Sequence, residues 1–142
     1  MKTRIIDAGF NEDTGISHVI IQTPKGTFTG YSKLQEEDRP YVSKYAGCRY
    51  AEIKANIKAV NAEIQEAESQ LSAFEKFYNN ISESKRFDPE SYEARKIRRQ
   101  IYELQEKVSE LVMTKVSMRN TLMTLIENRS REITSFYEHI NK

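Results

Sequence analysis

Arginine and asparagine side chains interrupt an apolar helical pattern near the C-terminus. Residues 124–140 read TLIENRSREITSFYEHI, and Arg129 stands where the spacing of apolar residues predicts Leu or Ile. Asn128 precedes it, and Arg119 and Asn120 interrupt an apolar turn upstream. Guanidinium and carboxamide groups donate hydrogen bonds to phosphates and hydroxyls. These four residues are therefore candidates for an anion site.

A second candidate group combines basic and aromatic residues. The run RKIRR, residues 95–99, contains Arg95 and Arg99 and follows a loop with Phe87 and Tyr92. Aromatic rings and guanidinium forks suit purines and phosphates. For RKIRR alone, a solvated helix face is the simpler interpretation.

Three interpretations of Arg129 remain open at the level of sequence. With Lys115, two heptads upstream, it would fix the register of paired helices. Alternatively, its stem covers the apolar surface while its head reaches water. The functional interpretation is an anion pocket between helices of two chains. Arg119 and Arg129 project roughly 80° apart on one helix, so a single helix does not aim both at one point.

The sequence gives little support for catalysis or for metal binding. The chain has two histidines and one cysteine, without the spacing of a zinc site, and it lacks phosphate-loop and nucleophile-elbow motifs. His18 fits a strand pattern, and Cys48 is interpreted as a small packing residue. We expect no enzymatic activity, no cofactor and no bound metal.

Composition narrows the class of partner. Charged residues make up 30% and hydrophobic residues 38% of the 142 residues, and the net charge is +1. Such a balance provides no overall field to attract nucleic acid or a membrane surface. No apolar run approaches the roughly 20 residues that span a bilayer, and the single cysteine fits a reducing compartment. We therefore expect a cytoplasmic protein without nucleic-acid or membrane partners.

The N-terminal residues 1–37 are predicted to form an antiparallel β-meander. The segments TRIIDAGF, SHVIIQT and TFTGYS are rich in β-branched and aromatic residues, and the turns NEDTG and PKG separate them. A three-stranded sheet must be covered on one face by a helix or by another chain.

Residues 38–142 are predicted to form a hairpin of two long antiparallel helices, in one structural unit with the meander. Asp38 is a candidate cap with Pro40 in the first turn, residues 79–91 form the loop, and the second helix begins at Pro89 or Glu90. Both helices carry heptad-spaced residues, here called the apolar seam: Ile53, Ile57, Val60, Ile64, Ala67, Leu71, Phe74 and Tyr78, then Ile97, Ile101, Leu104, Val108, Leu111, Lys115, Met118, Leu122, Leu125, Arg129, Ile133, Phe136 and Ile140. The fold class is α+β, and the helices would be roughly 60 and 75 Å long.

The entry to the first helix, KYAGCRYAEIKA at residues 44–55, contains Gly47. Glycine inside a helix costs about 1 kcal/mol relative to alanine. Close helix packing is the commoner reason for such a residue, and close approach of a ligand is the other.

The layout resembles the phage Thoeris anti-defence proteins of the first type. The resemblance is carried by the meander with DAGFNE, the YAGCRYAEIKA helix entry and the second long helix bearing Arg and Asn. It covers essentially the whole chain in length and layout. Proteins of this family are non-enzymatic sponges that hold a cyclised ADP-ribose signal made by bacterial TIR-domain enzymes, and some also hold cyclic oligonucleotides.

This resemblance implies a phage protein in the host bacterial cytoplasm, assembled from dimers, with signal pockets between two chains. Phe87 or Tyr92 would then stack on adenine. Arg119, Asn120, Asn128 and Arg129 would bind phosphates and ribose hydroxyls.

Two other functions remain as alternatives. The heptads also suit a coiled-coil structural or adaptor protein that recruits a protein partner. A nucleic-acid binder using RKIRR is the weakest alternative, because the net charge is near zero.

Long amphipathic helices also predict self-association, as a dimer or an assembly of dimers. Val112, Val116, Met123 and Ile126 are apolar but lie off the seam, so a helical hairpin alone does not cover them. We expect sedimentation velocity at micromolar concentration to give a mass above that of one chain. A purely monomeric boundary would contradict this expectation.

Overall fold

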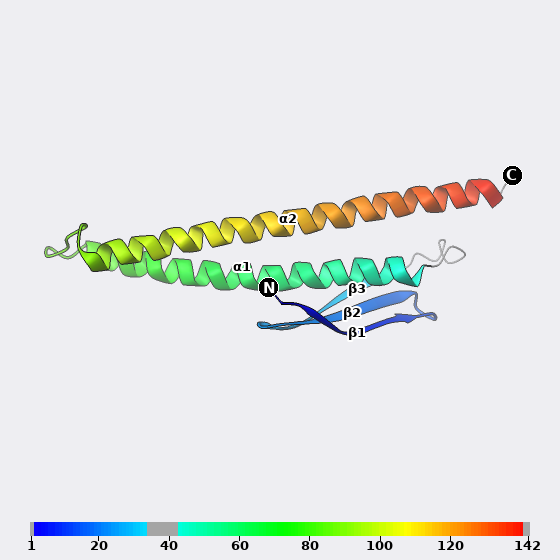
Figure 1. Ribbon diagram of the computed structural model, residues 1–142, viewed down its shortest axis with the longest axis horizontal. Coiled ribbons are helices and arrows are strands. Elements are labelled where there is room, and N and C mark those ends of the chain that lie inside the picture. Colours follow the sequence, from blue (N-terminus) through cyan, green and yellow to red (C-terminus); the bar gives the residue numbers. More distant parts are fainter. Residues whose placement is uncertain (1, 34–42, 141–142) are drawn as a thin grey trace. The chain divides into compact units, whose positions relative to one another are not determined.

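The computed structural model describes residues 2–33 and 43–140 and confirms the predicted α+β class (Figure 1). A three-stranded antiparallel sheet is followed by two long helices: β1 (Arg4–Asn11), β2 (Ile16–Thr23), β3 (Gly26–Lys33), α1 (Lys44–Ser82) and α2 (Tyr92–Ile140). The chain divides into two compact units. We call Met1–Val60 with Lys115–Lys142 the sheet unit, and Asn61–Thr114 the hairpin unit.

The sheet is the predicted meander, with strand order β1-β2-β3. Its first turn is stabilised by Asn11, whose side-chain Oδ1 accepts a hydrogen bond from the Asp13 amide at 2.9 Å. Gly15 ends that turn with a φ of 73°, and Gly26 ends the second with a φ of 131°. Both values lie in the region that favours glycine, and each glycine is the last residue of a turn identified in the sequence.

One face of β2 and β3 packs against the N-terminal part of α1, and this contact forms the core of the sheet unit. Val19 and Ile21 are buried against Ala51, Ala55 and Ala59. Phe28 and Cys48 pack on the same cluster, so Cys48 is a packing residue, as interpreted from the sequence.

The distance between α1 and the sheet is set by small residues. A Cβ atom added to Gly30 of β3 would collide with the carbonyl oxygen of Ala51 and the amide nitrogen of Ala55. Nearby, Lys58 Nζ donates a hydrogen bond to the Thr29 carbonyl at 2.7 Å and joins α1 to β3.

Serine residues cap both helices. The Ser43 hydroxyl accepts a hydrogen bond from the Ala46 amide at 3.1 Å, and α1 begins at Lys44. The predicted cap Asp38 and first-turn residue Pro40 lie outside the described residues.

The connection between the helices is shorter than the sequence predicted. Helix α1 continues to Ser82, beyond the expected loop start at residue 79. Ser91 caps α2 by accepting a hydrogen bond from the Ala94 amide at 3.2 Å, so the helix begins at Tyr92 and not at Pro89 or Glu90.

The apolar seam is confirmed wherever the structure describes it. From Ile53 to Tyr78 and from Ile97 to Phe136, each seam residue is buried or half-buried, including Lys115 and Arg129. In the hairpin unit, Phe74 of α1 and Leu104 of α2 border the same shallow groove, and Arg98 Nη1 donates a hydrogen bond to the Tyr78 hydroxyl at 3.0 Å.

We expect Gly30→Ala to reduce the free energy of unfolding by about 1–3 kcal/mol or more, because backbone atoms of α1 occupy the space of the new methyl group. Urea unfolding followed by circular dichroism measures this change. Gly9→Ala is the matched control, since its Cβ would meet only the movable ring of His18. Equal costs at the two positions would contradict the explanation.

Candidate functional site

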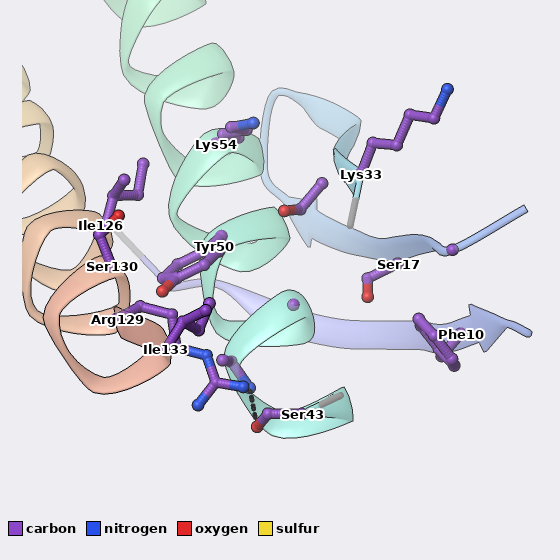
Figure 2. A pocket seen from close by; sticks show the side chains of 14 residues that line it. Phe10, Ser17, Lys33, Ser43, Tyr50, Lys54, Ile126, Arg129, Ser130 and Ile133 are labelled. Carbon is purple, nitrogen blue, oxygen red and sulfur yellow. Dashed lines mark hydrogen bonds between the residues drawn. The ribbon is translucent and has the colours of Figure 1, made fainter. Parts of the chain in front are cut away.

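A cavity of about 310 Å³ opens in the sheet unit between the sheet, the first turns of α1 and the C-terminal part of α2 (Figure 2). All three structural layers of this unit contribute to its wall. The lining residues are Phe10, Gly15, Ser17, Ser32, Lys33, Ser43, Ala46, Gly47, Tyr50, Lys54, Ile126, Arg129, Ser130 and Ile133.

The charged side chains in this wall are all cationic. Lys33 comes from β3, Lys54 from α1 and Arg129 from α2, and in Figure 2 the Lys33 side chain extends away from Arg129. No Asp or Glu is among the described residues that line the cavity. Since every charged residue described in the wall is positive, the cavity favours an anionic occupant.

Hydroxyl groups provide most of the remaining polar surface. Four serines and Tyr50 line the cavity, and the serines are Ser17, Ser32, Ser43 and Ser130. A hydroxyl both donates and accepts hydrogen bonds, so these groups suit the hydroxyls of a sugar as well as phosphate oxygens. Apolar surface comes from Phe10, Ile126 and Ile133, which suits the faces of a flat ring.

Arg129 faces this cavity because it occupies a position of the apolar seam. Its side chain is only 17% exposed, and Nη1 lies 3.3 Å from Glu132 Oε2, one turn further along α2. In Figure 2, the side chain extends from α2 toward the first turn of α1. A half-buried guanidinium can donate several hydrogen bonds at once, so Arg129 suits a bound anion better than the lysines of the wall do.

Tyr50 joins α1 to the turn of α2 that carries Arg129. Its hydroxyl donates a hydrogen bond to the carbonyl oxygen of Leu125 at 3.2 Å. Within an α-helix this carbonyl is also the acceptor for the amide of Arg129, four residues later. Burial raises the pKa of Tyr50 above its usual value of 10.0, the positive charge of Arg129 opposes that rise, and Glu132 adds to it.

Gly47 explains how α1 passes so close to the sheet beside the cavity. A Cβ atom at this position would run into the side chain of Ser17 on β2. The close-packing interpretation of Gly47 is therefore confirmed, and the same glycine also lines the cavity.

Of the eight ligand-binding residues predicted from the sequence, Arg129 lines this cavity. Arg119, Asn120 and Asn128 belong to the same unit, but their side chains are exposed and lie outside the cavity wall. Their exposure follows from the helical period, because none of these three residues falls on the apolar seam, which faces inward.

The other four predicted residues lie in the hairpin unit. Phe87 packs edge-on against Tyr78, with ring centroids 5.7 Å apart, so its ring is engaged in the end of the hairpin. Tyr92 is 70% exposed. Arg95 and Arg99 are exposed on α2. Arg98, which also belongs to the RKIRR run, contacts Tyr78 through its guanidinium group.

Sequence reasoning missed most of the wall, although one signal was present. Gly47, Tyr50 and Lys54 follow each other at spacings of three and four residues, so they lie on one face of α1. Lys33, Ser17 and Ser32 gave no comparable signal, because their place in the wall depends on how the sheet meets α1.

Comparisons with known proteins give no template for the site. No family model matches the chain, and no curated protein or solved structure is significantly similar to it. Within residues 2–33 and 43–140, no cluster of three or more His, Cys, Asp or Glu side chains is arranged to hold a metal ion. Over the same ranges, no helix is both long and apolar enough to cross a bilayer.

The raised pKa of Tyr50 predicts a pH dependence of stability. Above its usual pKa the unfolded chain loses the phenolic proton while the folded chain retains it, so stability falls as pH rises through the folded pKa. We expect the free energy of unfolding to decline less steeply in Tyr50→Phe than in wild type between about pH 9 and 11. Urea unfolding at stepped pH measures both slopes, and identical slopes would contradict the assignment.

Proposed function

We propose that this chain is a non-enzymatic binding protein that sequesters an anionic, nucleotide-type signal, of the cyclic ADP-ribose class, in the cavity of the sheet unit. The observation that carries the proposal is the wall itself. Arg129, Lys54 and Lys33 line a concave space that also has five hydroxyl-bearing lining residues and no carboxylate among its described lining residues.

The groups of such a signal match the groups of the wall. A pyrophosphate pairs with Arg129 and the lysines through charge-assisted hydrogen bonds. Ribose hydroxyls pair with serine hydroxyls, and a purine lies against Phe10, Tyr50 or the isoleucines. A cavity of about 310 Å³ is at the lower end of the usual range for ligand pockets, about 300–1,000 Å³, which favours a compact cyclic molecule over a polymer.

The composition of the wall also supports capture without chemistry. The wall contains serine hydroxyls, but His, Asp and Glu, the commonest general bases that would activate them, are not among the described lining residues. Tyr50 keeps its proton at neutral pH, since its ordinary pKa of 10.0 is already far higher and burial raises it further. The protein would therefore hold the signal stoichiometrically and release it unaltered.

The biological setting in this proposal rests on the resemblance to phage anti-defence proteins. A phage protein in the host bacterial cytoplasm would lower the free concentration of a signal from TIR-domain enzymes and so prevent the immune response. Self-association is part of the same proposal. It is supported by exposed apolar side chains on the α2 segment of the sheet unit, namely Val116, Met123 and Ile126.

The same exposed residues favour a second candidate function, a coiled-coil adaptor that recruits another protein. Val116 and Met123 differ by seven residues, the spacing of one helical face. An adaptor needs no small-molecule ligand. A thermal-shift screen with cyclic nucleotide signals therefore separates the two functions, since only the sponge is stabilised by its ligand.

Arg129→Ala tests the proposed site. We expect the variant to bind cyclic ADP-ribose at least about tenfold more weakly than wild type, because a half-buried charge-assisted contact is lost. Arg131→Ala is the matched control, since Arg131 is an exposed arginine two residues away and outside the cavity wall. Calorimetric titration measures both affinities, and sedimentation shows whether the assembly is unchanged.

Release of the bound ligand by heat denaturation of the protein distinguishes capture from turnover. The protein is incubated with cyclic ADP-ribose, separated from free ligand, and denatured, and the released molecule is identified by mass spectrometry. Recovery of intact ligand is expected. A hydrolysed product would contradict the non-enzymatic function, and equal affinities of Arg129→Ala and Arg131→Ala would contradict the site.

A further inference from the structure

We infer that Tyr50 is a positioning residue, whose hydroxyl holds the α2 turn that carries Arg129 at the wall of the cavity. The ligand-binding part of this inference rests on the proposed function. The structural part, a tether between α1 and α2 in the sheet unit, stands independently of any ligand.

The tether is a single hydrogen bond from the Tyr50 hydroxyl to the carbonyl oxygen of Leu125. Tyr50 reaches across from α1 and donates to Leu125, a residue 75 positions away in sequence. The Leu125 carbonyl also accepts the amide of Arg129 within α2. A carbonyl oxygen has two lone pairs, so it satisfies both donors. The residue that carries the cation and the residue that joins the helices therefore share one acceptor.

The chemistry of arginine explains why such a tether matters. A long side chain loses conformational freedom when it binds, and a protein that fixes its backbone in advance leaves less freedom to be lost. Arg129 is held partly by Glu132 on its own helix, but that contact does not place the helix relative to α1. Tyr50 provides this placement, and its ring lines the cavity beside Arg129.

The phenol of Tyr50 lies near the charged groups of Arg129 and Glu132. The charges of both Arg129 and Glu132 act on the pKa of Tyr50, in opposite directions. The phenol therefore lies close enough to the ion pair for a displacement of the Arg129 turn to change its surroundings.

A double-mutant cycle with cyclic ADP-ribose tests the action of Tyr50 through Arg129. We expect Tyr50→Phe to weaken binding about 2- to 10-fold, as for the loss of one hydrogen bond, because the ring remains and only the hydroxyl is removed. In the Arg129→Gln background, measured up to millimolar ligand, the same change should cost less than about twofold. An equal loss in both backgrounds would mean that Tyr50 acts on the ligand directly, and would overturn the inference.

Amide hydrogen exchange of the ligand-free protein tests the tether itself. Tyr50→Phe should increase exchange of the amides around Arg129 by several-fold, because the α2 segment opens more often without its contact to α1. Tyr45→Phe is the matched control, a tyrosine of the same helix whose side chain is 81% exposed. Unchanged exchange around Arg129 in Tyr50→Phe would overturn the inference.

The binding and hydrogen-exchange measurements show which of the two proposals is wrong, the proposed function or the positioning role of Tyr50. If wild type binds no cyclic ADP-ribose but exchange increases in Tyr50→Phe, the proposed function fails and the tether stands. If wild type binds the ligand but exchange and affinity are both unchanged in Tyr50→Phe, the proposed function stands and the positioning role is wrong.

Discussion

The contact between the backbone of α1 and the backbone of β3 is the constraint on which the sheet unit depends. Gly30 lies against the peptide groups of Ala51 and Ala55, without room for a methyl group. A small sheet buries little surface by itself, so it needs a helix at close range. Leucine or isoleucine side chains at these positions would move α1 outward and leave Val19 and Ile21 less completely covered.

The same close approach shapes the cavity. Near its N-terminal end, α1 passes Ser17 at Gly47, and the cavity lies beside this contact, lined by the sheet, α1 and α2. A seam position of α2 that would otherwise complete an apolar core then faces that space. Arg129 at this position is consistent with a cavity wall, where a guanidinium meets polar neighbours and part of the solvent.

The sequence predicted those features that depend on local periodicity. Alternating and heptad patterns identified three strands, two helices and the inward face of α2, because residue spacing alone determines which side chains share a face. Arg129 was identified because it breaks such a pattern. The wall residues Lys33, Ser17 and Ser32 were not identified, since their neighbours come from distant segments. The caps were also missed, because several serine and aspartate residues near each helix start are equally good candidates.

The glycine and alanine contacts have a consequence for how this protein can diverge. Seam residues such as Leu104 and Val108 can exchange with other aliphatic residues at small cost, so helix sequences drift while the fold persists. Gly30 has no such freedom, because a larger side chain would meet backbone atoms of α1, and Ala51 and Ala55 are completely buried in the core cluster. A distant homologue would therefore be recognised by three small residues in the right places, even after most of its helical sequence had been replaced.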